Sequence, residues 1–216
     1  MTSAQRLLIV TAHPSKESLN AEITRRFIAG IGAQAEVRER DLYRVGFNPV
    51  LSEEEWRSGF SGAVPEDCKV EQEHIQWATC LAWIFPAWNF GLPAILKGYL
   101  DRVFLIPGFS FASDATGTTY QGGLLRHHRA LVIQTLGSNL QTAYRFGNVA
   151  SYAAEAVSSL QYAGIRNVQV AQYWNMYRQM PAVPAEIEKI LSHAQGLGAS
   201  FFADTVSGVQ IVSSQV

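Results

Sequence analysis

Short apolar runs alternate with helical patterns five times along this chain, and this alternation constrains the fold more than any other feature. The first run, Arg6–Ala12, is nearly continuous in apolar residues, which is typical of a strand buried on both faces of a sheet. A helical pattern follows directly, with Leu19, Ile23 and Phe27 on one face. The sequence predicts strands at 6–12, 34–40, 80–86, 130–135 and 168–173, and helices at 18–30, 66–78, 93–104, 145–163 and 184–203.

Buried strands that alternate with helices predict a doubly wound α/β sheet. We expect a flavodoxin-like, five-stranded parallel sheet in the order 2-1-3-4-5, with helices on both faces. Residues 1–203 are expected to form a single domain. An insertion at about 41–66, which contains several prolines and glycines and an acidic stretch, is too short to have its own core. The C-terminal tail, 204–216, gives no signal of secondary structure.

The composition excludes several classes of protein. The 216 residues are 48% hydrophobic and 16% charged, which suits a globular core, and the net charge of -1 argues against a nucleic-acid or membrane-surface partner. Cys68 and Cys80 lack metal-ligand spacing and are expected to be small buried hydrophobic residues rather than reactive thiols. The apolar run Leu7–Val10 is too short for a signal sequence or a membrane span, so we expect a cytoplasmic protein.

The loop after the first predicted strand has the character of an anion site. In doubly wound sheets, ligands bind beyond the carboxyl ends of the strands where the strand order reverses, which here means the loops after strands one, three and four. The first of these, His13–Asn20, combines an imidazole, hydroxyls and backbone N–H groups at a helix N-terminus, where an anion is stabilised. The alternative is that Ser18 only caps the helix and His13 is a turn residue.

The other two loops suit a flat ligand. The loop after the third strand, 85–93, places Trp88 and Phe90 between two prolines, so it could form the wall of a pocket for a heteroaromatic ring. The loop after the fourth strand, 135–139, is small and polar, and Gly137 allows the backbone to approach a ligand closely. Each loop taken alone is also compatible with a simpler explanation, an aromatic core turn in the first case and an ordinary turn in the second.

Taken together, these loops resemble the flavodoxin-like NAD(P)H:quinone oxidoreductases, the family of the mammalian DT-diaphorases, bacterial modulators of drug activity and potassium-efflux ancillary flavoproteins. The most specific stretch is 89–104, Asn-Phe-Gly-Leu-Pro-Ala-Ile-Leu-Lys-Gly-Tyr-Leu-Asp-Arg-Val-Phe. His-Pro-Ser-x-x-Ser-Leu-Asn at 13–20, Glu71-Gln72 and Thr-x-Gly-Ser at 135–138 support it, and the resemblance runs from about residue 6 to 200. It implies an NAD(P)H dehydrogenase (quinone)-like flavoenzyme with FAD or FMN, which passes a hydride from NAD(P)H to quinones by a ping-pong mechanism.

The resemblance also implies roles for individual residues. One group would hold the flavin phosphates, with a glutamine nearby, and a second group would hold the isoalloxazine ring. The first group is His13, Ser18, Leu19, Asn20 and Gln72, and the second is Pro86, Ala87, Trp88, Asn89, Phe90, Thr135, Leu136, Gly137 and Ser138. The family is homodimeric with its active site at the dimer interface, and Phe109 and Phe111 match aromatic residues that reach over the partner's flavin. Alternatively, both phenylalanines are ordinary core residues of a returning strand.

The chain departs from the mammalian pattern at the proposed proton donors. The mammalian enzymes have a tyrosine and a histidine after the fourth-strand turn, which are thought to relay a proton to the reduced acceptor. Tyr144 lies near the tyrosine position if one residue is inserted, whereas 145–152 contains no histidine. The histidine-assisted relay is therefore in doubt, but hydride transfer belongs to the flavin and does not depend on it.

Two other functions remain open at this point. The chain could be a flavin-binding regulatory subunit of a membrane transporter, because the efflux ancillary proteins have the same loops. It could also be a flavodoxin-type electron carrier, although the near-neutral charge and the His13 loop argue against this. A dinucleotide-binding fingerprint at 30–35 is excluded because this glycine-containing segment follows a helix, where it is expected to form a C-cap.

Overall fold

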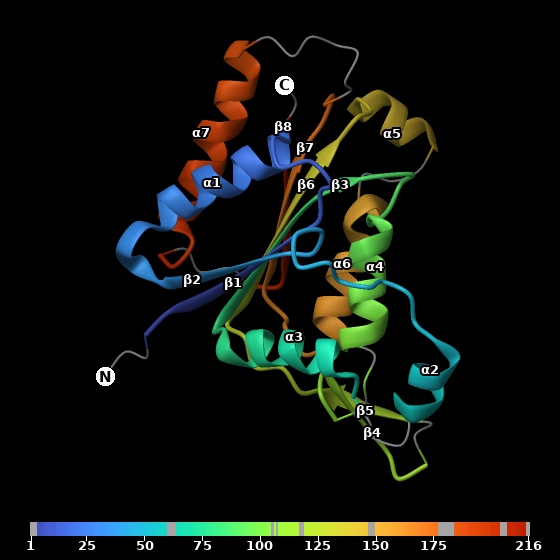
Figure 1. Ribbon diagram of the computed structural model, residues 1–216. Coiled ribbons are helices and arrows are strands. Elements are labelled where there is room, and N and C mark those ends of the chain that lie inside the picture. The colour runs from blue at the N-terminus through green and yellow to red at the C-terminus, as the bar shows by residue number, and fades with distance from the viewer. Residues whose placement is uncertain are drawn as a thin grey trace.

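The computed structural model describes residues 4–59, 64–104, 106, 108–116, 119–146, 150–176, 184–203 and 207–214. Their centre is a parallel sheet in the order β2-β1-β3-β6-β7-β8 (Figure 1). The expectation of a flavodoxin-like order is therefore confirmed for the first five of these strands. The strands are β1 Arg6–Thr11, β2 Glu36–Asp41, β3 Cys80–Ala87, β6 Arg129–Leu136, β7 Val168–Tyr173 and β8 Val209–Ser214.

The prediction of five strands is wrong, because the tail contributes a sixth strand. β8 lies beside β7 in parallel register, from the pair Val168 and Val209 to the pair Tyr173 and Ser214. Its apolar side chains stay about 40% exposed, as at Val209 and Ile211. The strand is therefore held by backbone pairing at the sheet edge rather than by burial, and this leaves no hydrophobic pattern from which the sequence could have predicted it.

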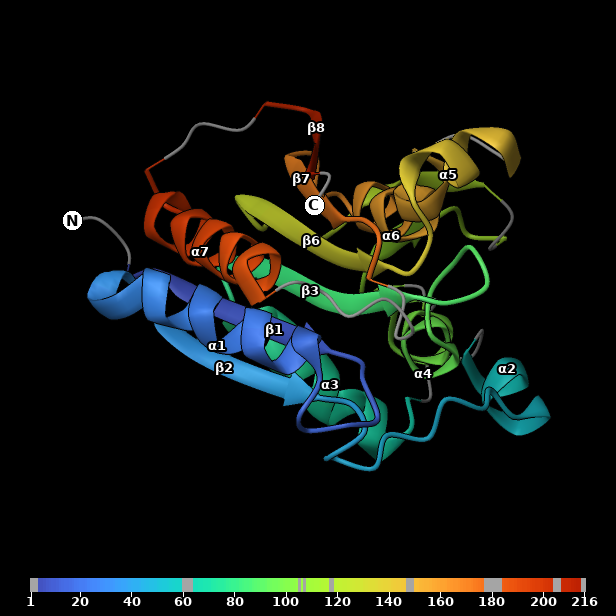
Figure 2. The same ribbon diagram turned by 90° about the horizontal axis from the view of Figure 1, so that it is seen from above.

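Helices cover both faces of the sheet (Figure 2). On one face, α1 (Leu19–Ile31) and α7 (Pro184–Ser200) lie side by side over strand residues such as Ile9 and Ile133. On the other face, α3 (Glu66–Trp77), α4 (Ala94–Tyr99) and α6 (Ser151–Tyr162) cover the alternate strand positions. Consecutive residues of β1, such as Leu8 and Ile9, therefore belong to opposite cores and are both fully buried.

Two predicted helices differ in detail. The helix expected over 93–104 is α4 followed by the π-helical turn η2 (Leu100–Phe104). The helix expected over 145–163 begins only at Ser151, and a separate short helix, α5 (Leu140–Phe146), precedes it. Residues 147–149, between the two, lie outside the described residues. Side-chain periodicity alone does not show where one helix ends and the next begins. The single helix predicted over 145–163 therefore includes the end of α5 as well as α6.

Smaller elements lie at the margins of the sheet. The region expected as an insertion contains the short helix α2 (Glu53–Gly59), and a 3₁₀ turn, η1 (Gly32–Gln34), follows α1. An antiparallel hairpin of β4 (Phe111–Ser113) and β5 (Tyr120–Gly123) forms a separate two-stranded sheet. Within the described residues, no helix combines the length and the apolar character needed to cross a membrane.

Candidate active site

A pocket of about 1070 Å³ lies at the carboxyl ends of β1, β3 and β6. The three loops singled out from the sequence meet there, which confirms the expectation that they lie close together. Four further lining residues come from α5, α6 and the segment after β7, and sequence analysis missed them. The pocket is lined by residues 13–15, 17–20, 86–90 and 135–139, together with Thr142, Tyr152, Asn175 and Met176.

The first loop presents a helix N-terminus and a histidine to the pocket. Ser18 is the N-cap of α1, and its hydroxyl accepts a hydrogen bond from the Ala21 N–H at 3.2 Å. His13 Nδ1 lies 3.0 Å from the Ser15 N–H and 3.2 Å from the Ser15 carbonyl oxygen, so the Ser15 backbone holds Nδ1 in either tautomer and Nε2 is the ring nitrogen that can face a ligand. Burial lowers the pKa of His13 by more than the Ser15 carbonyl and Asp41 raise it, which favours the neutral ring.

Asn20 and Thr135 connect the first loop to the third. The Thr135 Oγ1 lies 3.1 Å from Asn20 Nδ2 and 3.0 Å from Asn20 Oδ1, and both residues are buried. This contact joins the first turn of α1 to the end of β6 across a sequence separation of 115 residues. Because a buried side-chain hydrogen bond is costly to break, the two loops are held in a constant relative position.

The middle loop is a tight turn with an uncommon backbone. Trp88 and Gly91 exchange two backbone hydrogen bonds of 3.1 Å each. The residues between them, Asn89 and Phe90, have φ angles of 48° and 68°. Positive φ is the geometry of a type I′ turn, which favours glycine and asparagine, and it is strained for phenylalanine. The turn holds Phe90 57% exposed and Trp88 42% exposed at the pocket, and ligand sites are where such strain is retained.

The turn after β6 is bonded to the segment that follows β7. The Asn175 N–H donates to the Ser138 carbonyl at 2.9 Å, and the Met176 N–H donates to the Leu136 carbonyl at 2.8 Å. Asn175 and Met176 could have been found from the sequence, because they follow a buried strand and the same rule about carboxyl ends applies to them. Tyr152 gave no such signal, since it lies inside a helical pattern.

Four predicted site residues lie elsewhere in this chain and are not among the described residues that line the pocket. Gln72 is buried in α3, where its Nε2 donates to the Val103 carbonyl at 3.2 Å. Tyr144 is 69% exposed on α5. Phe109 is buried and packs edge-on against Phe104, the arrangement that the core alternative predicts. Phe111 lies in the β4–β5 hairpin, with its ring 5.2 Å from that of Tyr162.

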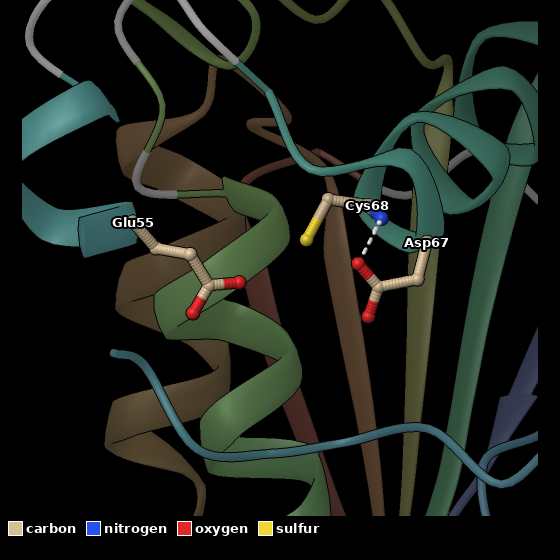
Figure 3. A group of neighbouring side chains, drawn as sticks. All are labelled: Glu55, Asp67 and Cys68. Atoms are coloured by element: carbon tan, nitrogen blue, oxygen red, sulfur yellow. Dashed lines mark hydrogen bonds between the residues drawn. The ribbon is translucent and has the colours of Figure 1, made fainter. Parts of the chain in front are cut away.

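A second group of polar side chains lies away from this pocket. Glu55, Asp67 and Cys68 offer potential ligand atoms within 4.8 Å of one another, from α2 and the start of α3 (Figure 3). The buried Arg102 supplies the positive charge, because it donates to Glu55 at 2.9 Å and to Asp67 at 2.7 Å. Burial raises the pKa of Cys68 to about 12, so the thiol stays protonated. We therefore assign this group as an ion pair that connects α2, α3 and η2.

Comparison with known proteins identifies the family. The model of the family described as having a flavodoxin-like fold matches residues 5–196. This chain belongs to that family. An NAD(P)H oxidoreductase of Haemophilus influenzae, described as uncharacterized, is 36% identical to this chain over 174 residues. The match covers 79% of this chain and 84% of that protein.

Solved structures agree with this assignment. An NAD(P)H:quinone oxidoreductase from Methanothermobacter marburgensis has 28% identity and a TM-score of 0.80, covering 92% of this chain and 98% of the other. An FMN-dependent NADH-azoreductase from Bacillus anthracis, solved in complex with FMN, has 19% identity and a TM-score of 0.69, covering 91% and 99% of the two chains. At 19% identity, the similarity to the azoreductase shows a common fold and no more.

Proposed function

We propose that this protein is a flavin-dependent oxidoreductase that takes a hydride from NAD(P)H and passes it to quinones or similar flat acceptors. The observation that carries the proposal is a pocket lined by two different kinds of loop. One loop contains His13 and the N-terminus of α1, and the other is the aromatic turn at 86–90. The relatives described above are named as NAD(P)H and quinone oxidoreductases, which supports catalysis. Neither the site nor these relatives favour the transporter-subunit alternative.

The residues present fit the two ends of a flavin. At one end, the His13 ring and the N-terminus of α1 offer N–H groups suited to phosphate oxygens. At the other end, Trp88, Phe90 and the turn at 135–138 form walls and a backbone edge suited to a flat ring. The phosphate-binding features are common to FAD and FMN, so the proposal is for a flavin of either kind.

The mechanism follows from where these groups lie. A bound flavin would supply hydride acceptance and donation, chemistry that no side chain offers. The loops would position its ring, and the exposed faces of Trp88 and Phe90 would flank the space for a second flat molecule. Because NAD(P)H and the acceptor would use the same space in turn, a ping-pong order is expected. Tyr144 stays a prediction as proton donor, and its exposed position on α5 would let its hydroxyl exchange protons with water.

We also propose a homodimer in which Phe111 reaches the partner's pocket. Figure 1 shows the β4–β5 hairpin at the opposite end of the sheet from α5, so Phe111 is far from the pocket of its own chain. The resemblance to dimeric quinone oxidoreductases supports this arrangement. Phe109 is packed in its own core, and a contribution from it to the partner's pocket would require it to leave that core. Gln72 stays a prediction for contact with the cofactor.

Purified protein tests the proposal directly. It should be yellow with about one flavin per chain, and heat release followed by mass spectrometry should identify FAD or FMN. Steady-state consumption of NADH or NADPH with menadione should follow ping-pong kinetics, which a simple electron carrier would not show. A colourless protein that leaves the fluorescence of added FMN and FAD unquenched would contradict the whole assignment.

A further inference from the structure

Tyr152 occupies a position that the family pattern does not explain. It lies in the first turn of α6 and is only 5% exposed, yet it lines the pocket. Its ring centroid is 5.7 Å from that of Phe90 on the strained turn and 5.3 Å from that of Trp174 at the end of β7. Tyr152 therefore lines the pocket next to the turn proposed to hold the flavin ring.

The polar ends of Tyr152 and Trp174 are buried beside the pocket. The Tyr152 hydroxyl and the Trp174 Nε1–H are both buried, and neither has a hydrogen-bond partner among the described residues. A buried donor without a partner is unfavourable, and native proteins retain one mainly where another molecule completes the bond. The two donors belong to one cluster with Leu136 and Ala143, next to the ring end of the pocket.

A buried amide chain fixes the Tyr152 backbone. The Gln134 Nε2 donates to the Tyr152 carbonyl at 2.8 Å, and Gln172 Nε2 donates to Gln134 Oε1 at 3.0 Å. Both glutamines are fully buried in the central strands β6 and β7. The start of α6 is thus bonded to the sheet through the Tyr152 backbone, while its side-chain hydroxyl is left without a partner among the described residues.

We propose that Tyr152 donates a hydrogen bond from its hydroxyl to the polar edge of the flavin ring, and so acts as a flavin-positioning residue from α6. The inference rests on the proposed function, because it needs a flavin in this pocket. The carbonyl oxygens and nitrogens of the ring edge are the acceptors that an unsatisfied phenol requires. This role differs from that of Tyr144, which is exposed on α5 and was predicted to deliver a proton to the acceptor.

The test compares the flavin-free protein with the flavin complex in Tyr152→Phe. Loss of an unsatisfied hydroxyl should leave the melting temperature of the flavin-free protein unchanged or higher. Flavin affinity, measured by fluorescence quenching with the flavin identified from the wild type, should fall about two- to tenfold, the range for one neutral hydrogen bond. The visible absorption bands of the bound flavin should also shift.

Tyr99→Phe is the matched control. Tyr99 is another buried tyrosine, but its hydroxyl faces Glu71 and its ring packs against Phe47 and Phe104, and it does not line the pocket. This variant should bind flavin as the wild type does.

Three outcomes would overturn the assignment. If Tyr152→Phe binds flavin with wild-type affinity and an unshifted spectrum while the wild type binds normally, the Tyr152 hydroxyl does not contact the ring and only this inference fails. A lower melting temperature of the flavin-free variant with unchanged affinity would mean that the hydroxyl supports the fold, for example through a buried water. A wild-type protein that binds no flavin would overturn both this inference and the proposed function.

Discussion

His13 shows how one side chain is prepared for a ligand before the ligand arrives. Its Nδ1 contacts the Ser15 backbone, 3.0 Å from the N–H and 3.2 Å from the carbonyl oxygen, which leaves Nε2 as the ring nitrogen that can face a ligand, and burial lowers its pKa. An N–H of the ring at a helix N-terminus can donate to a phosphate oxygen beside the backbone N–H groups of the helix. The ring also lies 5.9 Å from that of Trp88, which places the two proposed ends of the site in contact.

We predict that His13→Ala weakens flavin binding but not the chemical step. A phosphate contact is the same in the ground and transition states, so its loss is a loss of uniform binding. A hydrogen bond to a charged group contributes about 1.5–3 kcal/mol, which corresponds to roughly a 10- to 100-fold loss of affinity. Titration with flavin and turnover at saturating flavin would separate the two effects. Unchanged affinity with a much lower turnover would instead make His13 catalytic.

His128→Ala is a suitable control for that experiment. His128 is exposed before β6, and its hydrogen bonds to described residues are made by its backbone. Its replacement should leave flavin affinity unchanged.

At the scale of elements, glycines determine how closely α1 and α7 pack. A Cβ at Gly30 would lie 2.0 Å from the Gln195 carbonyl oxygen, and one at Gly198 would lie 2.2 Å from the Phe27 carbonyl oxygen. Both atoms belong to helix backbones that cannot move independently of the whole helix. The close contact of the two helices on this face of the sheet therefore requires both glycines.

Gly198→Ala and Gly196→Ala should change stability in opposite directions. The Gly198 substitution would force the helices apart and should lower the free energy of unfolding by about 1–3 kcal/mol or more. Gly196, two residues earlier in α7, is exposed, and a Cβ added there would meet no atom within 4 Å among the described residues. Its replacement by alanine should raise the free energy of unfolding by up to about 1 kcal/mol through helix propensity. Urea unfolding of both variants measures this, and equal effects would refute the packing argument.

Phe109 and Phe111 are close in sequence at the start of the β4–β5 region, but we expect them to have different roles. Phe109→Ala should cost about 3–5 kcal/mol of stability, because Phe109 is a buried core residue. Phe111→Ala should cost less, since Phe111 is only partly buried, and should raise the Michaelis constant for menadione if it lies over the partner's flavin. Thermal melts beside menadione kinetics distinguish the two. A large loss of melting temperature with an unchanged Michaelis constant would show that Phe111, too, is a core residue.

For the whole molecule, half-buried histidines predict a loss of stability in mild acid. Burial lowers the pKa values of His13, His74, His127 and His193 below the unfolded value of 6.5. In the range between each folded pKa and 6.5, the unfolded chain binds more protons, so stability rises with pH and falls as the pH drops. His127 is a clear case, because its Nε2 lies 2.9 Å from the Ile75 carbonyl and its Nδ1 is buried without a partner among the described residues.

The free energy of unfolding should therefore decrease between about pH 7.5 and pH 5.5, above the range in which most carboxylates titrate. Urea titrations at several pH values measure this slope. His127→Gln, whose Nε2 can take the place of the histidine Nε2 and donate to the Ile75 carbonyl, should make the slope smaller. A stability that is constant over this interval would contradict the pKa directions.

The sequence by itself determined the features that depend on local pattern. Near-continuous apolar runs predicted β1, β3 and β6, because a strand buried on both faces has few positions at which a polar side chain can reach water. The carboxyl-end rule then predicted which loops would meet, and the structure brings 13–20, 86–90 and 135–138 together in one pocket.

The tertiary structure alone decided features that depend on distant partners. β8 exists because β7 offers an unpaired edge, and Tyr152 lines the pocket because α6 begins beneath the ends of β3 and β6. Gly32 caps α1 as the sequence suggested, whereas Gly30 is required by the backbone of α7, which is far away along the chain. The periodicity of a sequence indicates which face of a helix or strand is buried, but it does not indicate which other element covers that face. This is the physical limit of what the sequence could predict here.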